Sequence, residues 1–546
     1  MRTHPGPTCQ LSPEALLLSI FLTIDKLSRY HKTDICSVIN GLDATILHHL
    51  GLCDEKGFEP ISYSTVQKQL LRLEQKVPFA QLMREDMAER GLDLLPWTDE
   101  SDGADPGFLW FNIDVLLATV TEEFLAKVAA GALDATAFET SARTRDYRVQ
   151  KEVDRAIREA LEAGEEFPDD VILGFDGKLM RCPSDPEARG SIRSASSETG
   201  FRKVWFDGYF VTSLAVSRDY EWSGIFNEIH LKEDLGPLTL AFSIAPATRN
   251  KGPIARDVTE AMKQLLPQLH VMTADREFSE KRESFVKPLH DLDIAVIMDY
   301  PRPFIERFDI VTLPNGERVY ETCGDHFPLW MPEEFLGAPD ASLSEEEKHE
   351  WYERRARFRY ESNGPLKNGK VQKLCPQCAG RVIYAKKTRM GKYKNAPHPD
   401  TALSFGPPFA AGYCCRGSVT LGGDYLRHWQ PTPWGSRAQD KLYNRGRSRI
   451  ENTYNLTKDD GAISKRACRA PGTAPRNMAF LAAAVVNNVQ FMEGASTVAE
   501  PDDTMPQAAL SLFCVEPAFT NGSDDGTDPI SHEEATGIAA PSRAPP

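Results

Sequence analysis

Residues 254–298 read IARDVTEAMKQLLPQLHVMTADREFSEKRESFVKPLHDLDIAVIM and set the architecture expected for the middle of the chain. Apolar side chains recur at helical spacing in 254–266 and again in 280–292. Two short apolar runs, 270–274 and 294–298, have the length and composition of buried strands. This alternation predicts a mixed α/β sheet with helices on its faces.

Segments on both sides extend this pattern. Upstream, three further strands are predicted at 171–175, 204–216 and 238–244. Downstream, residues 302–435 are rich in Pro, Gly, charge and Cys and have little helical period, which predicts a β-rich insertion. Helical spacing resumes at 439–459 and at 476–492.

The N-terminal 90 residues have a helical pattern. Ser12 and Pro13 begin one expected helix, shorter ones follow at 33–42 and 44–50, and Ser64 is expected to cap a polar helix ending at Leu73. Such a module is either a helix-turn-helix DNA reader or a plain helical bundle. In the first case the DNA-facing side chains are expected to be Gln67, Lys68 and Arg72. Residues 91–168 are expected to be a helical linker region.

Composition places the chain among large globular proteins. It has 546 residues, 41% of them apolar and 26% charged, which predicts two to four domains. No apolar run approaches the ~18 residues of a membrane span. The N-terminus lacks the pattern of a signal peptide, and 11 scattered Cys do not form the framework of a small secreted protein. We therefore expect a cytoplasmic location.

The net charge of −16 is unevenly distributed. Residues 498–546 hold nine acids and one base, and the tail 495–546 is expected to be disordered because it has few apolar groups. Residues 354–394 hold thirteen bases and one acid, interleaved with four aromatic side chains: Phe358, Tyr360, Tyr384 and Tyr393. This stretch is either a DNA-binding surface or a solvated loop.

Three acids occupy positions suited to phosphodiester chemistry. Asp176 directly follows the predicted strand 171–175, and Asp275 directly follows 271–274. Because parallel strands end at one sheet edge, acids there can converge. Glu451 lies in a predicted helix and shares one face with the residues at i−4, i+3 and i+7: Arg447, Tyr454 and Lys458. Taken singly, such acids are more often helix caps, turn formers or surface residues.

Three motifs together make the pattern more specific: Gly174–Gly177, Thr273–Phe278 and Arg447–Lys458. In them the chain resembles the DDE transposases of bacterial insertion sequences, over about 169–492. The third motif is similar to the Tyr-Arg-Glu-Lys signature of one branch, of which an actinobacterial subgroup is nearest. Arg447, Glu451 and Lys458 match the spacing. The signature Tyr would fall at Asn444, but the chain has Tyr443, one position earlier.

The resemblance implies a ribonuclease H-like catalytic domain in two parts, 169–301 and 436–494, separated by the insertion. It implies that Asp176, Asp275 and Glu451 hold two Mg²⁺ ions, with Mn²⁺ able to substitute, and that Tyr443, Arg447 and Lys458 bind DNA. Two such ions can activate an attacking oxygen and stabilise a leaving one. Glu277 and Asp207 are rival acids of lower rank.

The implied function is recognition of terminal inverted repeats in double-stranded DNA, followed by metal-dependent strand cleavage and strand transfer into target DNA, with a homodimer in the DNA complex. Two alternatives stay open. One is a catalytically decayed DNA-binding repressor, and the other is a ribonuclease H-like nuclease without strand transfer.

Four cysteines in the insertion carry a separate hypothesis. Cys375 and Cys378 have the spacing of a zinc knuckle, and Cys414 and Cys415 lie downstream. A structural zinc site would use three of these positions, with a fourth ligand from Cys323, His326 or His398. The alternative is that they are reduced, buried thiols.

Overall fold

The computed structural model describes residues 11–498 apart from 12, 28–29, 51, 55–56, 74–102, 141–161, 163–180, 183–184, 198–199, 224–227, 235–237, 248, 377–378, 380–417, 460–467 and 469–471. The expected strand 171–175 with Asp176 lies outside the described residues, as does the tail after Val498. The segment 495–498 continues a helix, so the expected start of the tail at 495 is too early.

Five strands form the centre of the main sheet: β3 (Ala130–Glu139), β6 (Gly200–Ser223), β8 (Thr239–Pro246), β9 (Val271–Ala274) and β10 (Ala295–Met298). Their spatial order is β8-β6-β3-β9-β10, that is 3-2-1-4-5 in order of sequence. β3, β9 and β10 are parallel, whereas β6 is antiparallel to both β3 and β8. This mixed sheet confirms the α/β class and the strands predicted at 204–216, 238–244, 270–274 and 294–298.

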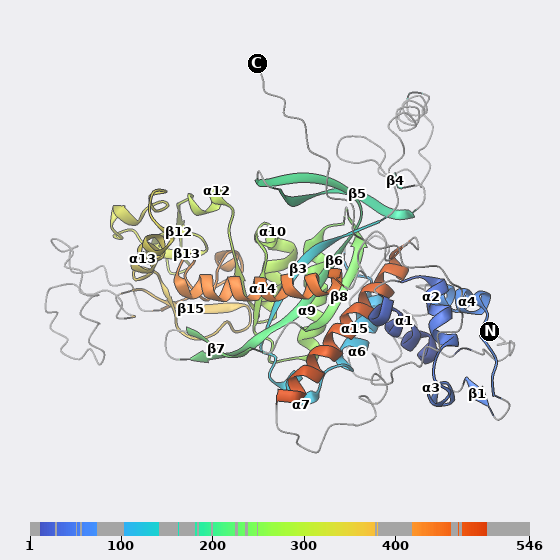
Figure 1. Cartoon of the computed structure of the whole chain (residues 1–546). Coiled ribbons are helices and arrows are strands. Elements are labelled where there is room, and N and C mark those ends of the chain that lie inside the picture. Colours follow the sequence, from blue (N-terminus) through green and yellow to red (C-terminus); the bar gives the residue numbers. More distant parts are fainter. Residues whose placement is uncertain are drawn as a thin grey trace, which may run out of the picture.

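Three outer strands extend the sheet beyond this centre. β5 (Asp185–Ser197) and β7 (Glu228–Asp234) pair antiparallel with the two ends of the long strand β6, and β4 (Arg181–Cys182) pairs with β5. The ribbon shows these outer strands projecting from the body of the sheet (Figure 1). The long β6 therefore connects the sheet centre to its extensions.

Strand β3 corrects the expectation of a wholly helical region at 91–168. Two helices do form there, α6 (Pro106–Leu117) and α7 (Glu122–Ala126), but 130–139 is the central strand of the sheet. Its sequence AGALDATAFE is rich in Ala and has high helix propensity. Pairing with β6 on one side and β9 on the other overrides that propensity.

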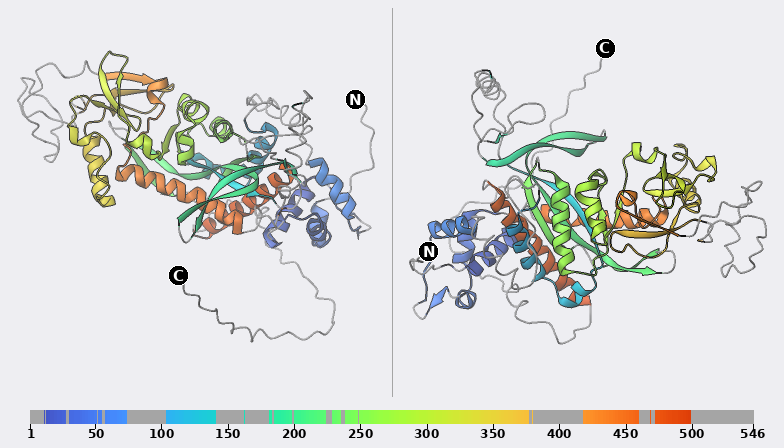
Figure 2. Two further views of the ribbon diagram at one scale, coloured as in Figure 1. Left: turned by 90° about the horizontal axis from the view of Figure 1, so that it is seen from above. Right: turned by 180° about the vertical axis from the view of Figure 1, so that it is seen from behind.

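Helices cover both faces of the sheet (Figure 2). α9 (Lys251–Leu265) packs on one face with α6, and α14 (Arg437–Asp459) and α15 (Thr473–Val498) pack on the other. Because both faces are covered, β8, β9 and β10 are buried along almost their whole length and do not alternate between apolar and polar residues. Between β9 and β10 the chain forms α10 (Arg276–Ser279), a π-helical turn η1 (Arg282–Val286) and α11 (Lys287–Asp291). The helices predicted at 254–266, 280–292, 439–459 and 476–492 are thereby confirmed.

The N-terminal helices form one unit with α15. They are α1 (Pro13–Leu27), α2 (Lys32–Asn40), α3 (Ala44–His49) and α4 (Tyr63–Leu73). Their buried side chains, including Ile20, Ile35 and Leu70, share a cluster with α15. The predicted helices are confirmed, but the cap of α4 is not Ser64. The Ser62 hydroxyl accepts from the Thr65 backbone N–H at 3.2 Å, and the helix begins at Tyr63, two residues earlier than a cap at Ser64 implies.

The insertion contains two small antiparallel sheets, as its β-rich pattern predicted. One consists of β11 (Asp309–Thr312), β12 (Arg318–Thr322) and β13 (Asp325–Pro328), and the other of β14 (Glu361–Ser362), β15 (Lys370–Leu374) and β16 (Ser418–Gly422). Helices α12 (Arg302–Ile305) and α13 (Glu345–Ala356) and the 3-10 turns η2 (Glu333–Phe335) and η4 (Gly423–Leu426) complete its described part. It lies at the β10 end of the main sheet, beside the start of α14 (Figure 1). Among the helices of the described ranges, none combines the length and apolarity that crossing a bilayer requires.

Candidate functional site

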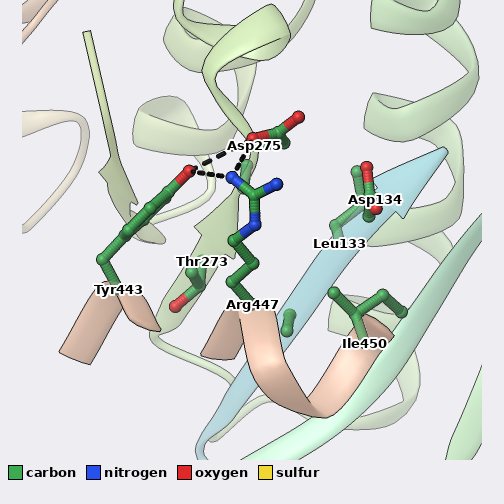
Figure 3. A pocket seen from close by; sticks show the side chains of 9 residues that line it. Leu133, Asp134, Thr273, Asp275, Tyr443, Arg447 and Ile450 are labelled. Carbon is green, nitrogen blue, oxygen red and sulfur yellow. Dashed lines mark hydrogen bonds and ion pairs between the residues drawn. The ribbon is translucent and has the colours of Figure 1, made fainter. Parts of the chain in front are cut away.

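Two carboxylates come from neighbouring parallel strands. Leu133 of β3 is in register with Ala274 of β9, so the next residues, Asp134 and Asp275, lie side by side at this level of the sheet. Asp134 is within β3, whereas Asp275 directly follows β9 and begins α10. Both line a hollow of about 200 Å³ that α14 closes from the other side. Figure 3 shows the two acids on adjacent strands above the helix.

Helix α14 approaches β9 closely because Gly446 has no side chain. A Cβ there would lie 2.6 Å from Cβ of Thr273, well inside van der Waals contact. The same turn of helix presents Tyr443, Arg447 and Ile450 to the hollow. This contact sets how far the side chains of α14 reach toward the sheet edge.

Tyr443 and Arg447 bind Asp275 directly (Figure 3). The Tyr443 hydroxyl donates to Asp275 Oδ1 at 3.1 Å, and Arg447 Nη1 donates to the same oxygen at 3.3 Å. Burial, followed by the charge of Asp275, raises the pKa of the Tyr443 hydroxyl, which keeps it a donor. Asn444 is exposed and bonds Asp440 instead. The aromatic residue one position before the signature position therefore faces the site, since 443 and 447 are one helical turn apart.

Asp134 has an unusual protonation equilibrium. Burial, and then the negative charges of Asp275 and Glu277, raise its pKa to about 7, although its own neighbour Ala135 donates a backbone N–H to Oδ1 at 2.7 Å. The backbone at this point is fixed by Tyr454, whose hydroxyl donates to the Asp134 carbonyl at 2.7 Å. A cation placed in the hollow would favour the ionised form of Asp134.

Glu451 reaches the site through Arg447. Its Oε1 accepts from Arg447 Nε at 2.7 Å, and its side chain is 50% exposed. Arg447 thus joins the expected acids Asp275 and Glu451, while Asp176, the third acid expected from the sequence, lies outside the described residues. Within the described ranges, no three His, Cys, Asp or Glu side chains are already grouped to hold a metal ion.

Sequence reasoning missed Asp134. The sequence does contain a signal. Asp134 is a single acid among apolar residues, Ala132-Leu133-Asp134-Ala135, just as Asp275 is a single acid after the apolar run of β9. The two rival acids are less suited. Glu277 is held by Lys251, whose Nζ lies 2.8 Å from both carboxylate oxygens. Asp207 lies inside β6 opposite Gly190, and its side chain is outside the description. The side chain of Lys458 on α14 is outside the description as well.

The polar helix α4 has the surface expected of it. Gln67, Lys68 and Arg72 are exposed, whereas Val66 and Leu70 are fully buried against the neighbouring helices. The three polar residues therefore lie on an accessible face of α4.

Two of the four aromatic side chains in the basic stretch 354–394 are not accessible to DNA. Phe358 and Tyr360 are buried, at 0% and 1% exposure, and Arg359 is buried between them. These side chains form the interior of the insertion and present no ring to an unstacked base, because their apolar surface packs in the insertion's core. Tyr384 and Tyr393 lie outside the described residues.

Of the four cysteines Cys375, Cys378, Cys414 and Cys415, Cys375 alone lies inside the described ranges. It follows β15 and is buried. Cys378, Cys414 and Cys415 lie outside the description, so the hypothesis stays a prediction. Two of the proposed fourth ligands are buried. Cys323 lies just before β13, and His326 lies within it. Burial raises the pKa of the Cys323 thiol to about 11, although Arg355 opposes the shift.

Comparison of the chain with protein-family models, with curated proteins and with solved structures gives no match.

Proposed function

We propose that the chain is a DDE-type DNA transposase with a ribonuclease H-like catalytic domain, and that Asp134 supplies its first carboxylate. One observation carries this proposal. Two acids meet at neighbouring parallel strands of a 3-2-1-4-5 mixed sheet, opposite a helix that brings Arg447 and Glu451. In this assignment Asp134 takes the place first given to Asp176.

The donors suit a hard divalent cation. Asp134 and Asp275 offer carboxylate oxygens on one hollow, and the pKa of Asp134 is raised by burial and then by the charges of Asp275 and Glu277, which a cation would offset. Asp134, Asp275 and Glu451 would hold Mg²⁺, or Mn²⁺ in its place. The ions supply activation of the attacking oxygen and stabilisation of the leaving oxygen during phosphodiester cleavage and strand transfer.

The other side chains of the site would position DNA. The Arg447 side chain is 45% exposed. Its guanidinium can therefore release Asp275 and bind a backbone phosphate instead, through two parallel hydrogen bonds. Tyr443 holds Asp275 in place from the buried side. Lys458, three turns further along α14, would contact the same DNA as a point charge.

End recognition would reside in the N-terminal helices. The exposed face of α4 with Gln67, Lys68 and Arg72 would read terminal inverted repeats in double-stranded DNA. Because two ends must be paired before transfer into target DNA, we expect a homodimer in the DNA complex. The bacterial cytoplasm, at the nucleoid, is the corresponding location.

The test uses the DNA that flanks the coding region in its native setting. The full chain with Mg²⁺ should cut at the borders of that DNA and join the released 3′ ends to a second duplex, and chelation by EDTA should abolish both reactions. Cleavage without joining would instead identify a nuclease. Specific binding of the borders without cleavage would identify a decayed transposase that acts as a repressor.

Arg447→Gln is expected to lower border cleavage by about 10- to 100-fold while leaving some activity, because a positioned charge-assisted contact contributes about 1.5–3 kcal/mol. Single-turnover cleavage with saturating Mg²⁺ measures the effect. Arg445→Gln is the matched control, since Arg445 is exposed on the same helix and does not line the hollow. Equal rates for the two variants would contradict a role for Arg447 in the site.

A further inference from the structure

A second hollow lies where the insertion meets the main sheet. It encloses about 300 Å³, part of it open to solvent, and gathers residues from four separate segments. The lining includes Arg282 of η1, Arg307 after α12, Glu321 of β12 and the pair Arg427-His428 after η4. Because these segments are far apart in sequence, tertiary folding alone brings their side chains together.

Positive charge prevails in this hollow. Three guanidinium groups, those of Arg282, Arg307 and Arg427, face two carboxylates. Asp309 already pairs with Arg307 at 2.8 Å, and burial raises the pKa of Glu321, although Arg427 and Arg282 oppose that shift. Arg282 and Arg427 form no close ion pair among the described residues, and both lie in the field of one carboxylate, that of Glu321.

Buried hydrogen-bonding groups in the same hollow lack partners. His428 is 2% exposed, and neither of its ring nitrogens bonds to any described residue. Nε of Arg427 is likewise buried and unpartnered within the described ranges. Burial, and then Arg282, lower the pKa of His428 to about 3, so the ring is neutral and offers one N–H. Unsatisfied buried donors are costly, and a ligand that accepts from them removes that cost.

The backbone holds His428 rigidly in position. Tyr300 donates its hydroxyl to the His428 carbonyl, and the Phe304 ring packs 4.2 Å from the imidazole. Gly324, at φ +73°, lies so close that a Cβ there would be 1.7 Å from the His428 carbonyl oxygen. The unpartnered imidazole is therefore fixed in the wall of the hollow rather than free to rotate into solvent.

This hollow and the acid pair share one edge of the sheet. Asp299 follows β10 and pairs with Arg276, the residue after Asp275, at 2.7 Å. The next residue, Tyr300, contacts His428. A strand of nucleic acid that crosses the acid pair and follows this edge would bring another of its phosphates to the second hollow.

We propose that the hollow formed by Arg282, Arg307, Arg427 and His428 binds a phosphate group. The planar guanidinium fork matches phosphate oxygens, and donors converging from several sides suit a tetrahedral anion. The phosphate belongs either to the backbone of a DNA strand or to a free phosphate or nucleotide. Its assignment to DNA rests on the proposed function, whereas phosphate binding itself does not.

Calorimetric titration of the full chain with inorganic phosphate and with pyrophosphate tests the site. Arg427→Gln should weaken binding at least about tenfold, because it removes a charge-assisted contact. His428→Phe keeps the ring packed on Phe304 but removes both nitrogens, and should weaken binding several-fold without changing the charge. Arg302→Gln is the matched control: Arg302 lies on α12 with an 85% exposed side chain, and it does not line the hollow. Thermal melts check that each variant is folded.

The salt dependence of DNA binding identifies the source of the phosphate. If the phosphate is part of DNA, Arg427→Gln should reduce the slope of log affinity against log salt by about 1 relative to Arg302→Gln. If Arg427→Gln loses phosphate binding but leaves the salt slope of DNA binding unchanged, the site binds a free phosphate or a nucleotide. The proposal is overturned if wild type binds neither anion saturably, or if folded Arg427→Gln and His428→Phe both bind like wild type. A protein that binds phosphate here but cuts no DNA would refute only the proposed function.

Discussion

Asp134→Asn should abolish metal-dependent DNA cleavage, with a rate loss of at least about 10³-fold. The substitution keeps the shape of the side chain but removes the charge that would hold Mg²⁺ beside Asp275. Metal ions contribute several kcal/mol to such reactions, and about 4 kcal/mol corresponds to 10³ in rate. Asp275→Asn should have the same effect, because the two acids line one hollow. Border cleavage under single-turnover conditions measures both.

Two further variants make this result specific. Asp424→Asn changes an exposed acid of η4 and should cut like wild type. Asp176→Asn addresses the acid that the sequence first indicated. If Asp134→Asn cuts DNA at the wild-type rate and Asp176→Asn is inactive, then Asp176 supplies the first carboxylate and Asp134 does not.

The same Asp134→Asn variant has a stability signature that depends on pH. The folded-state pKa of Asp134, about 7, lies above its unfolded value, so the native state retains a proton that the unfolded state releases. The resulting stabilisation is complete below about pH 4 and is lost as pH rises through 7. Without metal, Asp134→Asn should therefore be more stable than wild type by roughly 2–4 kcal/mol at pH 8 and nearly equal at pH 4.5. Urea unfolding in EDTA at the two pH values measures this, and an equal difference at both would refute the shift.

Arg359→Ala should destabilise the insertion by about 3–5 kcal/mol, because it leaves buried acids without their cation. Arg359 is 1% exposed, lies 3.5 Å from Asp325 and 3.7 Å from Glu361, and donates to the Pro431 carbonyl at 3.0 Å. Burial, and then Arg359, lower the pKa of the nearby Lys373 to about 7. Removing Arg359 takes away the second cause but leaves the burial that disfavours a charged Lys373.

Hydrogen exchange of residues 302–374 and urea unfolding of the full chain measure the loss. Arg318→Ala, at an exposed position on β12, is the control and should change stability by less than about 0.5 kcal/mol. Adding Asp325→Asn and Glu361→Gln to Arg359→Leu should recover part of the stability, since the two buried acids are then neutral and need no cation. A loss below about 1 kcal/mol in Arg359→Ala would show that the cluster is not a structural centre of the insertion.

Much of the fold could be predicted because local pattern and tertiary environment agree. The runs 238–298 alternate between apolar strands and amphipathic helices, and the structure has strands and helices there. The spacing of Arg447 and Glu451 places both on one face of α14, where they are joined at 2.7 Å. The acid after β9 was also apparent, because a strand ending in an acid is visible in the sequence itself.

The first acid of the site was not apparent, because its strand has no local signal. β3 is an Ala-rich segment that would favour a helix in isolation, and it becomes a strand through pairing on both edges. Residues 171–175 had the stronger strand pattern, so Asp176 was preferred. Likewise, Phe358 and Tyr360 stand among basic residues in the sequence, as aromatic residues do in nucleic-acid-binding surfaces. The structure buries both side chains inside the insertion, so they are not part of such a surface.

By itself, the sequence of this protein determined which segments alternate between strand and helix, which helix face carries Arg447 and Glu451, and where charge accumulates along the chain. These properties depend on residues close together in sequence. Only the tertiary structure decided that Asp134 is the neighbour of Asp275, that Tyr443 reaches it from α14, and that three arginines meet at His428. Each of these depends on strand pairing and packing between segments that are distant in sequence, and the free energy of those contacts outweighs local propensity.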